Sequence, residues 1–291
     1  MSAFADRFIE TTRAFGPLCV GIDPHPGRIP ALFGGDTPDG LSRWGQAMLN
    51  AIEGVVGVVK PQVALFERHG WEGMKALADV STAAKAKGFT VLMDAKRGDI
   101  GSTAEGYARA YLSADAPFAC DAMTANPYMG TDTLQPLIDT AQKAGKGVIV
   151  LARTSNPGAK DFQNLDIGGT PFYLRVVDAL NRLSQPLKGE SGWSGLMLVV
   201  GATAPDEALA IRHRAEKLLF LVPGYGAQGA GASAALSGFV NGEGGCVSAS
   251  RSVNFPEGSD VAATESDWQS IVHAAAQQAQ SELREAATQP A

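Results

Sequence analysis

Residues 90–100 read Thr-Val-Leu-Met-Asp-Ala-Lys-Arg-Gly-Asp-Ile, an apolar run that becomes charged. The β-branched and apolar start is typical of a buried strand. Asp94, Lys96 and Asp99 then follow at the place where such a strand would end. Strand side chains alternate between faces, so Asp94 and Lys96 should point the same way, where an acid and a base keep each other ionised. Taken alone, the segment fits equally well a strand end whose charges simply emerge into solvent.

Similar apolar runs occur along the whole chain, and helical patterns separate them. With 90–96, the expected strands are 18–23, 55–59, 122–126, 147–152, 195–200, 218–222 and 245–250. The expected helices are 2–13, 41–53, 67–87, 102–113, 131–143, 171–184, 206–214 and 266–285. Strict alternation implies a parallel sheet, and eight such units in 291 residues fit an α/β fold of the closed (β/α)8 TIM barrel type. We therefore predict a single barrel domain over residues 1–285, with 286–291 as a frayed tail.

A doubly wound open sheet is the competing architecture. Such sheets often bind nucleotides through a GxGxxG turn after the first strand, or through a GxxxxGK[ST] loop. Here a proline-rich loop follows the first apolar run, and no GxxxxGK[ST] segment occurs. The barrel is therefore the favoured prediction.

The composition is that of an ordinary globular chain, with 45% apolar residues, 19% charged residues and a net charge of −6. That charge opposes a general attraction to nucleic acid. Cys19, Cys120 and Cys246 lie far apart and form no CxxC or Cys/His metal pattern, which indicates free thiols in a reducing compartment. Residues 1–10 lack a signal-peptide core, and no apolar run reaches the roughly 18 residues that span a bilayer. We expect a cytoplasmic protein with no membrane or nucleic-acid partner.

Polar residues stand at the ends of five of the eight apolar runs, where a barrel enzyme carries its active site. These residues are Asp23, Lys60, the pair Asp94 and Lys96, Ser155, and Arg251. Each has an ordinary explanation: a surface lysine before a proline, a Ser-Asn-Pro-Gly turn, or an arginine paired to a helix. Together, the four charges on the first three strands would form a ring of alternating sign, which indicates a functional site.

Glycines and an arginine follow the last two apolar runs. Gly224, Gly226 and Gly229 let the backbone approach a ligand closely, and Arg251 supplies a planar cation. The loops after strands seven and eight are the usual phosphate site of TIM barrels. This combination predicts a phosphate-binding site.

The charged stretch resembles the DxKxxDI signature of the orotidine 5′-phosphate decarboxylase family, whose reaction is the last step of UMP synthesis. Further matches fall in family order along the chain: Gly21-Ile22-Asp23, Val59-Lys60-Pro61, Pro223-Gly224-Tyr225-Gly226-Ala227-Gln228-Gly229 and Ser250-Arg251-Ser252. Residues 154–158 and the insertion 161–193 resemble the longer bacterial branch. One departure is Ser250, since many members have glycine before the phosphate arginine.

The resemblance implies catalysis without a cofactor or metal. Lys96 would sit at C6 of orotidylate, stabilise the carbanion that CO₂ leaves behind, and donate the proton. Asp94 would lie beside the departing carboxylate. Lys60 and Asp99 would complete an alternating Lys-Asp-Lys-Asp network in which each charge holds its neighbours ionised.

The resemblance also implies a homodimer with shared active sites, because in the family the second aspartate, here Asp99, reaches into the other subunit. Ile100 and Thr103 would accompany it. The remaining implied contacts are to the ribose hydroxyls (Asp23, Lys60), the pyrimidine edge (Ser155) and the phosphate loop (Pro223, Gln228, Arg251).

Three alternatives stay open. A Mg²⁺-dependent sugar-phosphate decarboxylase or aldolase of the same barrel superfamily resembles this chain in its DxKxxD strand, but typically carries an acid where this chain has Lys60. A Schiff-base aldolase would need Lys60 or Lys96 in its neutral form, which the flanking carboxylates oppose. A non-catalytic nucleotide-binding protein would bind UMP tightly without turnover.

Overall fold

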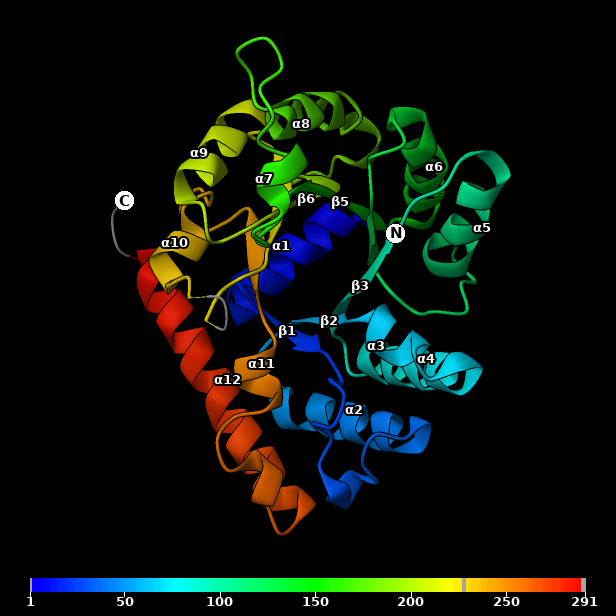
Figure 1. Cartoon of the computed structure of the whole chain (residues 1–291), viewed down its shortest axis with the longest axis vertical. Helices are drawn as coiled ribbons and strands as arrows, with labels where there is room; N and C mark the ends of the chain where they lie inside the picture. Colours follow the sequence, from blue (N-terminus) through cyan, green and yellow to red (C-terminus); the bar gives the residue numbers. More distant parts are fainter. Residues whose placement is uncertain (1, 227–228, 289–291) are drawn as a thin grey trace.

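The computed structural model describes residues 2–226 and 229–288, in which eight parallel strands close into a barrel surrounded by helices (Figure 1). The strands pair in chain order, and β1 pairs with β8 to close the ring. They are β1 Leu18–Ile22, β2 Val58–Pro61, β3 Thr90–Arg97, β4 Ala122–Ala125, β5 Gly147–Arg153, β6 Ser194–Val200, β7 Leu218–Val222 and β8 Gly245–Ala249. The predicted single-domain TIM barrel is confirmed, and the open-sheet alternative is wrong.

Helices follow the strands and cover the outside of the barrel (Figure 1). The longer ones are α2 Pro38–Ile52, α4 Gly70–Ala86, α5 Gly101–Leu112, α6 Gln135–Ala144, α8 Phe172–Arg182, α9 Pro205–Arg214 and α12 Glu265–Thr288. The shorter ones are α3 Val63–Glu67, α7 Ala159–Phe162, α10 Ala232–Leu236 and α11 Arg251–Asn254. Their apolar faces bury the outward-facing strand residues, such as Val20, Val91 and Val150, in one continuous core.

Several predicted boundaries differ from the structure: the strand expected over 55–59 lies at Val58–Pro61, and two helices differ as well. The helix expected over 67–87 begins only at Gly70, as α4, where the glycine takes a left-handed backbone with φ +67°; Glu67 instead ends the separate short helix α3. The sequence predicts a frayed tail from residue 286, but residues 286–288 belong to α12, and both Ala286 and Ala287 pack against the core. Residues 289–291 lie outside the described part of the chain.

Helix α1 (Phe4–Phe15) closes the amino-terminal end of the barrel (Figure 1). Its apolar face of Phe4, Ala5, Phe8 and Ile9 packs on the residues that fill the barrel interior, which include Val58, Leu92, Ile149 and Met197. Gly147 at the start of β5 permits this approach, since a Cβ there would lie 2.5 Å from the Phe4 ring. The amphipathic pattern of residues 2–13 is therefore that of a plug, and the polar chemistry belongs to the opposite end of the barrel.

The three cysteines are all buried and unpaired. None of the described helices is long and apolar enough to cross a membrane.

Candidate active site

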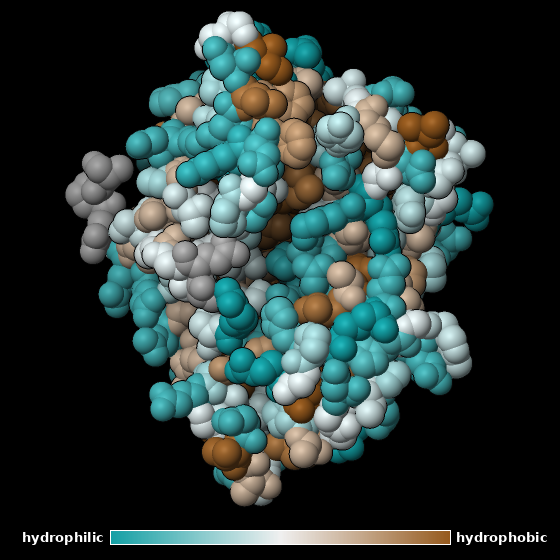
Figure 2. Space-filling view, in the orientation of Figure 1, coloured by the Kyte–Doolittle hydropathy of each residue, from teal (hydrophilic) through white to brown (hydrophobic). Residues whose placement is uncertain are grey.

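A pocket of about 550 Å³ opens at the carboxyl ends of the strands, in the middle of the face shown in Figure 2. Apolar side chains, Leu151, Val199 and Leu221, contribute to its lining beside the charged groups. Seven of the predicted site residues also line it: Asp23, Lys60, Asp94, Lys96, Ser155, Pro223 and Arg251. The structure therefore brings together residues from six different strand ends at one mouth.

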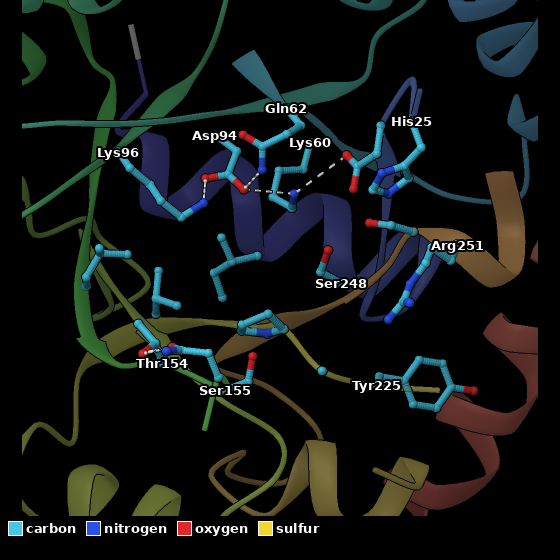
Figure 3. Close-up of a pocket in the computed structure, with 18 residues that line it drawn as sticks. His25, Lys60, Gln62, Asp94, Lys96, Thr154, Ser155, Tyr225, Ser248 and Arg251 are labelled. Atoms are coloured by element: carbon cyan, nitrogen blue, oxygen red, sulfur yellow. Dashed lines mark hydrogen bonds and ion pairs between the residues drawn. The ribbon is translucent and has the colours of Figure 1, made fainter. Parts of the chain in front are cut away.

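Asp94 is the centre of the charged part of this pocket (Figure 3). Its Oδ1 accepts hydrogen bonds from Lys96 Nζ at 2.6 Å and from Thr124 Oγ1 at 3.0 Å. Its Oδ2 accepts from Lys60 Nζ at 3.0 Å and from Gln62 Nε2 at 2.8 Å. Two donors on each oxygen fix the orientation of a carboxylate that is only 6% exposed. Three of the four charges expected in the alternating network thus lie in direct contact.

Burial alone would neutralise the groups of this cluster, but their mutual attraction prevents it. Burial raises the pKa of Asp94, and the ammonium groups of Lys60 and Lys96 outweigh it, so the pKa lies well below its ordinary value. Burial also lowers the pKa of Lys60, and the carboxylates of Asp94 and Asp23 outweigh it, so this pKa lies well above its ordinary value. Asp94 therefore stays ionised and Lys60 protonated across the neutral pH range.

Lys96 departs from the regular strand geometry predicted for residues 90–96. β3 pairs regularly with β4 as far as Met93, and the register then shifts before Arg97. Within this bulge Lys96 takes a left-handed backbone with φ +47°, which costs a non-glycine residue about 1–3 kcal/mol. The side chain meets Asp94 as predicted, but through the bulge and not through plain alternation. The Lys96 side chain is 48% exposed, so its ammonium group is accessible to a ligand in the pocket.

Asp23 lies beside Lys60, with its Oδ1 atom 4.0 Å from Nζ. This carboxylate is 8% exposed, and Oδ1 accepts no hydrogen bond from any described residue. A buried oxygen without a donor is costly, so a hydrogen bond from a further donor would stabilise this carboxylate. Asn254 fixes the backbone here, since its side chain accepts from Asp23 N at 3.0 Å and donates to Gly21 O at 2.7 Å.

Ser155 lies in the turn after β5, and the neighbouring segment holds that turn in place. Thr154 N donates to Gln163 Oε1 at 2.9 Å, and Gln163 Nε2 donates back to Thr154 Oγ1 at 2.8 Å. Gly201 at the end of β6 lets the turn pack closely, because a Cβ there would lie 2.9 Å from Ser155 Cα. Residues 154–156 are thus both a turn and a wall of the pocket.

The ends of β7 and β8 contribute Pro223, Ser250 and Arg251 to the pocket. Ser250, the departure from the family pattern, fits because Gly21 on the neighbouring strand has no side chain; a Cβ on Gly21 would collide with Ser250 Oγ. Gln228 lies outside the described residues, so its phosphate contact stays a prediction.

Three predicted residues do not line the pocket of their own chain. The Asp99 carboxylate accepts a hydrogen bond from Ile100 N at 2.8 Å, next to it in the chain. Ile100 is 62% exposed, and Thr103 is exposed on the first turn of α5. Their entry into the site of another subunit stays a prediction.

The pocket also contains residues that the sequence interpretation missed. They are His25, Gln62, Thr154, Asn156, Tyr225 and Ser248. Gln62 carries a usable signal, because it lies two positions after Lys60 and strand alternation puts it on the same face. Thr124, the buried donor to Asp94, carries none, since a threonine in a short apolar strand has no distinguishing pattern.

Comparison with known proteins identifies the family. The sequence profile described as "Orotidine 5'-phosphate decarboxylase / HUMPS family" matches residues 16–251. The chain belongs to this family. It is 36% identical over 301 residues to a Rhodopirellula baltica protein named orotidine 5′-phosphate decarboxylase, with 98% of this chain and 100% of that protein covered. A Salinispora arenicola protein of the same name is 40% identical over 233 residues, with 80% and 82% covered.

Solved structures agree with this assignment. The structure of Leishmania donovani OMP decarboxylase superposes with a TM-score of 0.78 at 32% sequence identity, and 100% of each chain is covered. The resemblance found in the sequence is confirmed. The family and the names of these relatives support a carboxy-lyase that decarboxylates orotidine 5′-monophosphate in UMP biosynthesis.

Proposed function

We propose that this pocket decarboxylates orotidine 5′-monophosphate to UMP without a cofactor or metal, using Lys96 as the proton donor at C6. The observation that supports this role is the position of the Lys96 ammonium group. It is accessible in the pocket and lies 2.6 Å from the ionised, buried Asp94. A cation held in place by a fixed carboxylate is preorganised for charge that develops next to it.

The reaction balances with the side chains present. The bond between C6 and the substrate carboxylate breaks, CO₂ leaves, and the electron pair remains on C6. The Lys96 ammonium group stabilises this carbanion and transfers a proton to C6, which yields UMP, and solvent then reprotonates the lysine. Asp94 beside the substrate carboxylate disfavours the anionic ground state, and that repulsion disappears as CO₂ forms.

The other pocket residues orient the substrate in this proposal. Asp23 and Lys60 bind the ribose hydroxyls. A ribose hydroxyl would donate the hydrogen bond that Asp23 Oδ1 receives from none of the described residues. Ser155 takes the pyrimidine edge. The loop with Pro223 and Gln228 binds the phosphate together with Arg251. The phosphate is remote from C6, but its binding energy can close loops over the substrate and so lower the activation barrier of decarboxylation.

The first expected result is direct turnover by the purified protein. The absorbance of orotidine 5′-monophosphate should fall on mixing in excess EDTA, and adding Mg²⁺ in excess of EDTA should leave the rate unchanged. Turnover that vanishes in EDTA and returns with Mg²⁺ would favour the metal-dependent sugar-phosphate class of mechanism. Tight UMP binding with no turnover would favour a non-catalytic nucleotide-binding protein.

We further propose a homodimer in which Asp99, Ile100 and Thr103 enter the site of the partner subunit. These residues lie outside their own pocket, in the segment after β3. The neighbouring loop after β4 exposes Tyr128 and Met129, which are 82% and 45% exposed. Like Ile100, they are large apolar side chains left exposed, as expected of residues that a second copy covers.

Mixing two inactive variants tests this shared site. Lys96→Ala and Asp99→Ala chains, each nearly inactive, are unfolded together and refolded as a mixture. In a mixed two-fold dimer one site collects both defects and the other is intact, so roughly a quarter of all sites should regain full activity. The measurement is turnover of orotidine 5′-monophosphate per site, with separately refolded parents as the control.

If Asp99 served its own chain, every site in the mixture would keep one defect. A mixture no more active than its parents, with mixed dimers demonstrated by mass spectrometry, would therefore contradict the shared site. We also propose a cytoplasmic location, supported by three buried thiols that remain unpaired.

A further inference from the structure

Thr124 forms hydrogen bonds with both Lys96 and Asp94, the two central residues of the site. It lies on β4 with no exposed surface, and it is not among the residues that line the pocket. Its Oγ1 accepts a hydrogen bond from Lys96 N at 2.8 Å and donates to Asp94 Oδ1 at 3.0 Å. The one other acceptor near this hydroxyl among the described residues, Met93 O, is more distant at 3.5 Å.

The hydrogen bond from Lys96 N to Thr124 Oγ1 stands where regular pairing of β3 with β4 is interrupted. In the bulge between Met93 and Arg97 the pairing of β3 with β4 shifts register. There the Lys96 backbone N–H meets the Thr124 side chain. A buried N–H without a partner would be costly, so the hydroxyl stabilises the left-handed backbone that Lys96 needs at this point.

The Thr124 hydroxyl also donates a hydrogen bond to Asp94, the ion-pair partner of Lys96. Asp94 Oδ1 receives both the Thr124 hydroxyl and the Lys96 ammonium group. One side chain therefore holds the backbone of the lysine and the carboxylate oxygen that its ammonium group approaches.

We propose that Thr124 is a positioning residue for the proton donor, which holds the Lys96 backbone in its left-handed conformation and aligns the Asp94–Lys96 pair. This inference rests on the proposed role of Lys96. Because Thr124 does not line the pocket, its loss should affect the chemical step and leave substrate binding nearly unchanged.

The test compares Thr124→Val, which keeps the shape of the side chain and removes the hydroxyl, with Thr124→Ser, which keeps the hydroxyl. A displaced catalytic group can cost about 100-fold in rate, so kcat of Thr124→Val should fall by about 10- to 100-fold while KM changes by less than about threefold. Thr124→Ser should keep kcat within about threefold of the wild type.

Thr90→Val is the matched control. Thr90 is also a buried threonine, at the opposite end of β3, where its hydroxyl contacts Thr11 Oγ1 at 3.3 Å. This variant removes a threonine hydroxyl from β3, the strand that pairs with β4, at the end far from the pocket. Its kcat should match that of the wild type. Melting temperatures of all variants separate a loss of folded protein from a loss of rate.

If Thr124→Val does not fold, the pair Thr124→Ala and Thr124→Ser isolates the hydroxyl, because both lack the methyl group. A Thr124→Val or Thr124→Ala variant with the kcat of Thr124→Ser would overturn the inference, as would a loss confined to KM. The proposed role of Lys96 fails separately, and visibly, if Lys96→Ala keeps substantial turnover.

Discussion

Replacing Lys96 with alanine is expected to lower kcat for orotidine 5′-monophosphate by at least about 10⁴-fold, since both a proton donor and a charge-stabilising group are lost. UMP binding should change little, because UMP has neither the substrate carboxylate nor a developing carbanion for the ammonium group to contact. The fold should persist, since Asp94 keeps the hydrogen bonds from Lys60 and Gln62. The measurements are single-turnover decarboxylation and titration calorimetry with UMP.

Lys143→Ala is a suitable control for the lost lysine, because Lys143 lies exposed on α6, away from the pocket. It should retain the kcat of the wild type. Substantial decarboxylation by Lys96→Ala would remove Lys96 from the proton-donor role, and a large loss of UMP affinity would show that the lysine contributes mainly to ground-state binding.

Asp94→Asn is expected to damage stability as well as activity. The substitution leaves Lys60 buried, with the nearest remaining carboxylate oxygen, that of Asp23, 4.0 Å away. Removing one partner of a buried ion pair costs about 3–5 kcal/mol, because the other charge stays without compensation. Urea denaturation should therefore show a correspondingly lower free energy of unfolding, and decarboxylation should fall together with it.

The effect of pH gives this prediction a second measurement. The folded-state pKa of Asp94 lies below its ordinary value, so its ionisation stabilises the wild type above the unfolded-state pKa of about 4. That contribution is lost as the pH falls toward the folded-state pKa. The stability difference between the wild type and Asp94→Asn should thus narrow below about pH 4. The raised pKa of Lys60 acts at the other end, since its contribution is complete below the ordinary lysine pKa and is lost only in strong alkali.

A double variant, Lys60→Met with Asp94→Leu, separates the effect of an unpaired buried charge on stability from the effect of a changed side-chain shape. Replacing both charges with apolar groups should recover much of the stability that Asp94→Asn loses, while the protein stays inactive. An Asp94→Asn protein as stable as the wild type would mean that water or Asp23 compensates Lys60 fully, contrary to the burial of this lysine.

The barrel and the general position of the site follow from local patterns in the chain. Short apolar runs that alternate with amphipathic segments bury both faces of a sheet only if the strands are parallel and the helices cover them. Once the strands are parallel, their carboxyl ends meet at one mouth. Asp23, Lys60 and Asp94 are therefore predictable neighbours, although they are far apart in the sequence, because each stands at the end of its own strand.

The geometry that makes the site work depends on contacts between distant parts of the chain. The left-handed backbone of Lys96 requires the register shift between β3 and β4 and a hydroxyl from Thr124. The backbone of Asp23 is held through Asn254, 231 residues away in the sequence. Pattern analysis compares residues within a window of neighbours, so it detects periodic burial but carries no information about which buried polar group meets which. Such pairings arise only when the elements pack, since the cost of burying an unpaired polar group selects among the partners that packing brings together.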